Sequence, residues 1–152
     1  MTLKLSDFSQ PTTSGKTLSL DDLMGHFTIV YFYPKDSTPG CTLEGQDFRD
    51  HFEAFQSLGT QIYGVSRDSL KSHENFKCKQ NFPFELISDQ TEALCKMFDV
   101  IKLKNMYGKE VMGIERSTFI INPQGEIAAE WRKVSIKGHV IEVLEKLKSL
   151  AA

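Results

Sequence analysis

The fold of this chain is set by residues 27–41, FTIVYFYPKDSTPGC, where an apolar segment meets a polar segment rich in turn-forming residues. The apolar part, Phe27 to Tyr33, is short and consists of β-branched and aromatic residues, and Pro34 ends it. A short run of this composition predicts a strand that is buried on both faces. We therefore expect Phe27 to Tyr33 to be the central strand of a sheet.

The rest of the chain alternates between predicted helices and strands. Residues 18–25 suit a short turn of helix, and apolar spacing predicts longer helices over residues 43–58, 69–79, 91–98 and 140–150. Strands are expected at residues 61–66, 84–87, 117–121 and 127–131, with a lysine- and glycine-bearing loop over residues 102–113. The turn signal at residues 122–125 makes the last two strands an antiparallel pair. This order predicts one α/β domain over residues 1–152, with a mixed sheet covered by helices on both faces.

Charge and composition exclude several classes of partner. The chain has 152 residues, with 18 Lys and Arg against 20 Asp and Glu, so its net charge of -2 disfavours binding to nucleic acid or anionic lipid. No secretory signal is visible, and the apolar run Phe27 to Tyr33 is far shorter than the roughly 20 residues that a membrane span needs. The three cysteines at positions 41, 78 and 95 suit a reducing compartment. We expect a cytoplasmic protein.

The sequence lacks a complete motif for nucleotide binding, serine hydrolysis or metal binding. The run Gly15-Lys16-Thr17 lacks the first glycine of a phosphate-binding loop, because Gln10 stands in that place. No dinucleotide fingerprint or serine nucleophile motif occurs, and the histidines at positions 26, 51, 73 and 139 lack the paired spacing of zinc ligands. We expect neither a cofactor nor a metal.

Cys41 occupies the junction between the central strand and the first long helix. If Thr38 is the N-cap and Pro39 the first helical residue, Cys41 lies in the first turn, where free N–H groups and the helix dipole favour a thiolate. The alternative is a buried cysteine that acts as a small apolar residue. Thr38 and Glu44 exclude a C-x-x-C pair around Cys41, so a self-contained dithiol exchange site is disfavoured.

The motif Pro34-x-x-x-Thr38-x-x-Cys41 resembles the peroxidatic motif of peroxiredoxins. The run Thr38-Pro39-Gly40-Cys41-Thr42-x-Glu44, followed by Arg49-Asp50, is similar to the bacterioferritin comigratory protein, or peroxiredoxin Q, branch. The likeness extends to Gly64-Val65-Ser66, to residues 82–89 and to Glu115-Arg116-Ser117-Thr118. This resemblance implies a thioredoxin-like fold and a cysteine peroxidase that reduces hydrogen peroxide and organic hydroperoxides with electrons from thioredoxin.

The resemblance also implies roles for single residues. Cys41 would be the peroxidatic nucleophile, and Arg116 would stabilise its thiolate and the reacting oxygens. Thr38 would orient the peroxide or the sulfur, and Pro34 would shape the pocket and shield the thiolate from water. Without the resemblance, Thr38 is equally explained as a helix cap, Pro34 as a strand terminator and Arg116 as a surface residue.

The chain departs from the common pattern of this branch at the second cysteine. Many members carry a resolving cysteine five residues after the first, where this chain has Gln46. Others place it on the next helix, so Cys78, between Lys77 and Lys79, is the expected resolving residue. Cys95 is expected to be a core thiol. A Cys41–Cys78 bridge needs α-carbons within roughly 7 Å, so we expect helix unwinding on oxidation.

Two other functions stay open at this point. One is a one-cysteine peroxidase that uses an external thiol, and the other is a noncatalytic redox-sensing or chaperone-like protein on the same fold. By analogy with the branch we expect a monomer. The preferred hydroperoxide and the physiological reductant do not follow from the sequence.

Overall fold

A six-stranded mixed sheet forms the centre of the computed structural model, which describes residues 3–152. Its order is β1-β10-β9-β4-β5-β6, with β4 parallel to β5 and antiparallel to β9. The strands are β1 (Leu3–Lys4), β2 (Ser9–Pro11), β3 (Thr17–Ser19), β4 (Thr28–Phe32), β5 (Gln61–Ser66), β6 (Glu85–Ser88), β7 (Ile101–Met106), β8 (Lys109–Ile114), β9 (Ser117–Ile121) and β10 (Glu126–Trp131). The helices are η1 (Leu20–Leu23), α1 (Pro39–Asp50), α2 (Phe52–Gln56), α3 (Leu70–Gln80), α4 (Ala93–Met97) and α5 (His139–Ala151).

The predicted central strand is confirmed as β4. All of its residues are buried and it is paired on both edges. Alternate side chains enter two separate core clusters: Ile29 and Tyr31 lie in one, Val30 and Phe32 in the other. A strand with two buried faces requires this uniformly apolar sequence, because neither face meets water.

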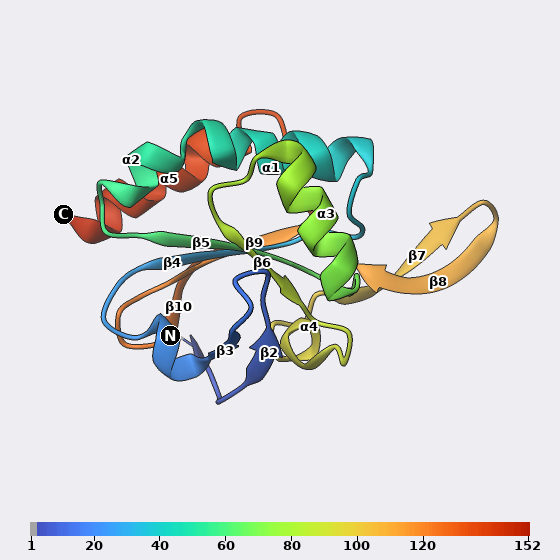
Figure 1. Ribbon diagram of the computed structural model, residues 1–152, viewed down its shortest axis with the longest axis horizontal. Coiled ribbons are helices and arrows are strands. Elements are labelled where there is room, and N and C mark those ends of the chain that lie inside the picture. Colours follow the sequence, from blue (N-terminus) through green and yellow to red (C-terminus); the bar gives the residue numbers. More distant parts are fainter. Residues whose placement is uncertain (1–2) are drawn as a thin grey trace.

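Helices cover both faces of the sheet, as expected. The first core cluster lies under α1, α2, α3 and α5. The second lies under α4, the short helix η1 and the small β2–β3 hairpin (Figure 1). α1 follows β4 directly in the chain, so its start lies beyond the carboxyl end of β4. After α1 and α2 the chain returns to the sheet as β5, which is parallel to β4.

The expectation of a loop over residues 102–113 is wrong. The segment forms a regular antiparallel hairpin of β7 and β8, which projects from the body of the molecule (Figure 1). Because the hairpin extends into solvent, the face that carries Leu103 and Met112 is largely exposed. Leu103 is 60% exposed and its cross-strand partner Met112 is 56% exposed. β7 does begin with apolar–polar alternation, Ile101-Lys102-Leu103-Lys104, but the lysines and glycines of the segment favoured the interpretation as a loop.

The helix expected over residues 43–58 is divided in two. α1 ends at Asp50, and His51 separates it from α2 with backbone angles of φ -108° and ψ 8°. The His51 ring Nδ1 lies 2.8 Å from the carbonyl oxygen of Asp47. This contact replaces a backbone partner at the end of α1. Across residues 3–152, no helix combines the length and apolar character needed to cross a membrane.

Candidate active site

Cys41 lies in the first turn of α1 and is 2% exposed. Thr38 is the N-cap and Pro39 the first helical residue, as the sequence predicts. The backbone N–H of Thr42 donates to the carbonyl oxygen of Thr38 at 2.9 Å, which begins the helical hydrogen-bond series. The sulfur therefore lies at the positive end of a helix of twelve residues, where negative charge is stabilised.

Arg116 connects the Cys41 sulfur to a buried carboxylate. It lies between β8 and β9, 75 residues from Cys41 in sequence, and its Nη2 donates to the Cys41 Sγ at 3.3 Å. Its Nη1 donates to Oε1 of Glu44 at 2.6 Å. The side chain of Arg116 is 16% exposed. One planar guanidinium thus holds the sulfur and the carboxylate at fixed positions.

Gly40 allows this close approach. A Cβ at this position would lie 3.2 Å from Nη2 of Arg116 and 3.3 Å from Cδ1 of Ile136. The segment after β10 also holds the arginine backbone, because the N–H of Val134 donates to the carbonyl oxygen of Arg116 at 3.0 Å. The guanidinium is therefore packed between the first turn of α1 and residues 134–136.

Glu44 is the residue of this site to which the sequence analysis gave no role. It is fully buried, and burial raises its pKa to about 7 although the charge of Arg116 opposes that shift. Its Oε1 accepts the arginine hydrogen bond, and its Oε2 has no hydrogen-bond partner among the described residues. The spacing of the sequence could have indicated this position, because Glu44 is three residues after Cys41 and therefore lies on the same face of α1.

The guanidinium of Arg116 remains charged despite its environment. Burial acts to lower the pKa of Arg116, but the carboxylate of Glu44 and the sulfur of Cys41 raise it, and the net shift is upward. Lys104 of β7 brings a second cation toward the site. Its pKa is lowered by burial and by the positive charge of Arg116, while the Cys41 charge opposes that effect.

Thr38 and Pro34 lie on the loop between β4 and α1, and both are half-buried. The Thr38 hydroxyl donates to the carbonyl oxygen of Lys35 at 2.8 Å. That bond uses the hydroxyl proton and leaves the oxygen free to accept a hydrogen bond from a bound molecule. Pro34 follows β4 by one residue, after the buried Tyr33.

The other two cysteines lie apart from this cluster. Cys78 is exposed near the end of α3 and lines a shallow hollow of 380 Å³ with Lys77 and Asn81. Cys95 is buried in α4, and its pKa is raised by burial and by a hydrogen bond with Asp89. An inert thiol of this kind matches the expectation of a core residue.

One group of potential metal ligands lies outside this cluster. Ligand atoms of Asp36, Asp68 and His73 lie within 4.8 Å of one another. Both ring nitrogens of His73 already have partners, because Nδ1 lies 2.7 Å from Asp36 Oδ2 and Nε2 lies 2.9 Å from the carbonyl oxygen of Ile87. The 2.7 Å separation is a hydrogen-bond distance, so these groups satisfy one another as a hydrogen-bonded cluster.

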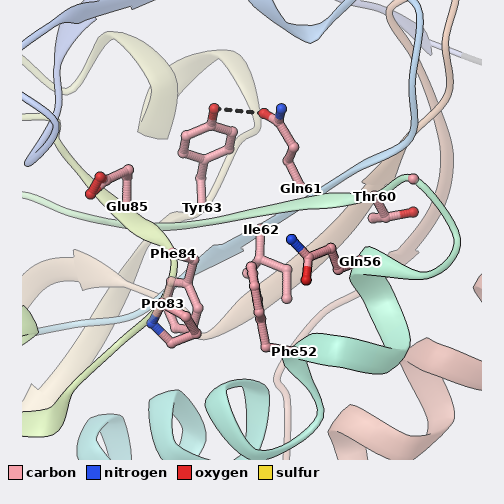
Figure 2. A pocket seen from close by; sticks show the side chains of 10 residues that line it. Phe52, Gln56, Thr60, Gln61, Ile62, Tyr63, Pro83, Phe84 and Glu85 are labelled. Atoms are coloured by element: carbon pink, nitrogen blue, oxygen red, sulfur yellow. Dashed lines mark hydrogen bonds between the residues drawn. The ribbon is translucent and has the colours of Figure 1, made fainter.

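A separate cavity of 440 Å³ lies at the opposite end of β5 from the Cys41 cluster. Figure 2 shows Phe52, Ile62 and Phe84 on one side of the sheet edge, with Gln61, Tyr63 and Glu85 on the other. The Tyr63 hydroxyl donates to Gln61 Oε1 at 2.8 Å. The cavity contains none of the expected site residues and no nucleophilic thiol, so it offers no alternative to Cys41.

Comparison with known proteins gives a consistent result. The AhpC/TSA family model matches residues 2–130. A peroxiredoxin Bcp from Xanthomonas campestris is 54% identical over 95% of this chain and 91% of its own length. A peroxiredoxin Bcp from Bacillus subtilis is 49% identical over 97% of this chain and 94% of its own length.

The fold agrees with solved structures of this group. A structure of Xanthomonas campestris peroxiredoxin Q superimposes with a TM-score of 0.93 at 52% identity, covering 99% of this chain and 98% of that chain. The thioredoxin-like fold and the family that the motif resembles are thereby confirmed. This chain belongs to the AhpC/TSA family, in its Bcp or peroxiredoxin Q branch, and is a thiol peroxidase.

Proposed function

We propose that this peroxidase reduces organic hydroperoxides and hydrogen peroxide at Cys41, forms a Cys41–Cys78 disulfide and is recycled by thioredoxin. The observation that supports it most strongly is the double contact of Arg116, which donates to the Cys41 sulfur and to Glu44. Among relatives, ligand-complex structures of the Xanthomonas campestris bacterioferritin comigratory protein concern its alkyl peroxide reduction activity. The same substrate class is proposed for this chain.

In the first step the Cys41 thiolate attacks one peroxide oxygen. A sulfur–oxygen bond forms and the oxygen–oxygen bond breaks, so the sulfur is oxidised to sulfenic acid. The second oxygen leaves with the bond electrons and takes a proton, which gives an alcohol or water. The N–H groups of Arg116 stabilise both the starting thiolate and the negative charge that develops on the leaving oxygen.

The loop before α1 prepares the peroxide for this attack. The Thr38 oxygen accepts a hydrogen bond from the peroxide O–H, since its own proton is used by the carbonyl of Lys35. Pro34 is a half-buried wall on the approach to the sulfur and limits the access of water. A dry site strengthens the electrostatic effect of Arg116.

In the second step the Cys78 thiol attacks the sulfenic sulfur. A disulfide forms, the sulfenic oxygen leaves as water, and a dithiol of the thioredoxin type then reduces the disulfide by exchange. Cys78 is exposed and lies between Lys77 and Lys79 in sequence, so its thiol is accessible for this attack. Structures of the Xanthomonas peroxiredoxin Q have been solved with either of two cysteines replaced by serine.

The test is intact-mass analysis and peptide mapping after the reduced protein is treated with one equivalent of hydrogen peroxide. We expect a Cys41–Cys78 disulfide in the wild type, and sulfenic or sulfinic acid on Cys41 in Cys78→Ser. The matched control is Cys95→Ser, which removes the buried thiol and leaves the disulfide intact. An oxidised Cys41 without a bridge in the wild type would establish a one-cysteine enzyme instead.

A coupled assay tests the reductant and the substrate. Thioredoxin, thioredoxin reductase and NADPH are supplied, and NADPH oxidation is followed with hydrogen peroxide or an alkyl hydroperoxide. Turnover should be abolished in Cys41→Ser. Activity with glutathione but not with thioredoxin would contradict the proposed reductant.

A further inference from the structure

The start of α3 is joined to the loop before Cys41 by a buried hydrogen-bond cluster around Asp36. Its Oδ1 accepts from the Tyr33 hydroxyl at 2.6 Å. Its Oδ2 accepts from the Ser72 hydroxyl at 2.8 Å and lies 2.7 Å from Nδ1 of His73. His73 is fully buried, and its Nε2 donates to the carbonyl oxygen of Ile87. Opening this cluster would leave buried polar groups without partners, which is costly.

The cluster also fixes the loop backbone. The N–H of Asp36 donates to Oδ2 of Asp68 at 2.9 Å. Asp36 lies between Pro34 and Thr38, five residues before Cys41. The first turn of α3 therefore holds the loop that carries Pro34 and Thr38, which we propose act at the Cys41 sulfur.

The other end of α3 is attached to α1 by weaker contacts. The side-chain amide of Gln46 donates to Oε1 of Gln80 at 2.9 Å, and Nη1 of Arg49 donates to the carbonyl oxygen of Gln80 at 2.8 Å. Arg49 is 32% exposed. Water can replace these bonds when they open, so this attachment is the easier of the two to release.

The intact helix keeps Cys78 directed away from Cys41. Phe76 is buried in the same core cluster as Cys41. An α-helix turns about 100° per residue, so Cys78, two residues later, points about 200° from Phe76. It faces the exposed hollow near Glu74 and Asn81. Rotation or unwinding of the last turns of α3 is therefore required before the two sulfurs can meet.

We propose that the two attachments of α3 serve different steps of the cycle: the Asp36–His73 pair positions the peroxidatic loop throughout, whereas the contacts of Gln46 and Arg49 with Gln80 restrain Cys78 and open for disulfide formation. This inference rests on the proposed role of Cys78. Asp36 and His73 are positioning residues, since they act on the peroxide through the loop and touch no reacting atom. Gln46 and Arg49 set the rate at which sulfenic acid is resolved, and thereby the exposure of Cys41 to overoxidation.

The restraint is tested with Gln46→Ala and Arg49→Ala. Both variants should form the disulfide about three- to tenfold faster after one equivalent of hydrogen peroxide, and a smaller share of Cys41 should reach sulfinic acid in excess peroxide. The rate of the first oxidation step should stay within about twofold of the wild type. Asp50→Ala is the matched control, because it removes the ion-pair partner of Arg49 and leaves the hydrogen bond from Arg49 to the Gln80 carbonyl in place. Unchanged disulfide formation in both restraint variants would overturn their assignment.

The positioning pair is tested in a Cys78→Ser background, where only the first step is measured. His73→Leu should slow Cys41 oxidation by at least about tenfold, and His73→Asn should recover most of the rate, because its amide group can keep a hydrogen bond to Asp36. Ser72→Ala removes one hydrogen bond to Asp36 and should give an intermediate rate, which keeps the test valid if His73→Leu fails to fold. A wild-type rate in Ser72→Ala, and in His73→Leu where that variant folds, would overturn the positioning role.

Amide hydrogen exchange locates the opening. In the oxidised protein the N–H of His73, bonded to the Ser69 carbonyl, should stay protected, whereas those of Asn81 and Phe82, bonded to Cys78 and Lys77, should exchange freely. Loss of protection at His73 would contradict a fixed first turn. If no Cys41–Cys78 disulfide forms in the wild type, the restraint falls together with the proposed resolving step. The positioning role is then still decided by the first-step rates.

Discussion

Nη2 of Arg116 lies 3.3 Å from Sγ of Cys41, although 75 residues separate them along the chain. The contact exists because β9 is antiparallel to β4, so the start of β9 lies beside the end of β4. Arg116 directly precedes β9, and Cys41 follows β4 by one short loop. The sheet thus brings a cation and a nucleophile to the same edge.

Arg116→Lys is expected to lower kcat/KM for hydrogen peroxide by about a hundredfold or more. Lysine keeps a positive charge but cannot donate to the sulfur and to Glu44 with one planar group, and loss of one such donor typically costs that much in rate. Steady-state kinetics measure the effect. Arg132→Lys, at an exposed arginine outside the site, is the control and should retain full activity.

Glu44→Gln is expected to remove a pH dependence of stability. The pKa of Glu44 is about 7 in the folded protein against an ordinary value of 4.5. The folded state therefore binds a proton that the unfolded chain releases, so the free energy of unfolding falls as pH rises through this range. The full effect is about 3 kcal/mol at 1.4 kcal/mol per pKa unit. Urea unfolding of both proteins across that range measures it, and identical pH slopes would contradict the buried carboxyl.

His139 should produce a pH dependence of the opposite sign. Burial lowers its pKa to about 4 from 6.5, and its Nε2 lies 2.8 Å from the Thr118 hydroxyl. Between these two pKa values the His139 side chain binds a proton in the unfolded chain but not in the folded protein. The free energy of unfolding therefore falls as pH drops from about 6.5 to about 4. His139→Gln should flatten this acid decline by about 3 kcal/mol. Denaturant unfolding in the Glu44→Gln background separates the two groups, and an unchanged decline would refute the assignment.

Gly45→Ala should destabilise the protein although it improves helix propensity. Alanine gains about 1 kcal/mol over glycine inside a helix. A Cβ at Gly45 would clash with the ring of Phe82, and overpacking of this kind costs about 1–3 kcal/mol. The net expected loss is about 1 kcal/mol, measured by urea unfolding. The loss should vanish when Phe82→Leu is combined with Gly45→Ala, and a stabilised single variant would show that Phe82 yields without cost.

The local pattern of the sequence determined most of the helices and strands. Short-range rules account for the apolar run of β4, the start of α1 at Pro39, the strand β5 and the presence of a helix at α3. The hairpin of β7 and β8 was missed for a physical reason. Strands that project into solvent bury little of either face, so polar residues and glycine are tolerated along them and the segment resembles a loop.

The sequence by itself determined the family, the candidate nucleophile and its place at the start of a helix, because these depend on residues close together in the chain. Only the tertiary structure decided that Glu44 is buried against Arg116, that His73 is joined to Asp36, and that Gln80 is held by Gln46 and Arg49. Each of these contacts joins residues that are distant in sequence or sets a degree of burial. Contacts between distant residues and the burial of single side chains arise only when the helices pack on the sheet. The helical or strand periodicity of the sequence does not specify them.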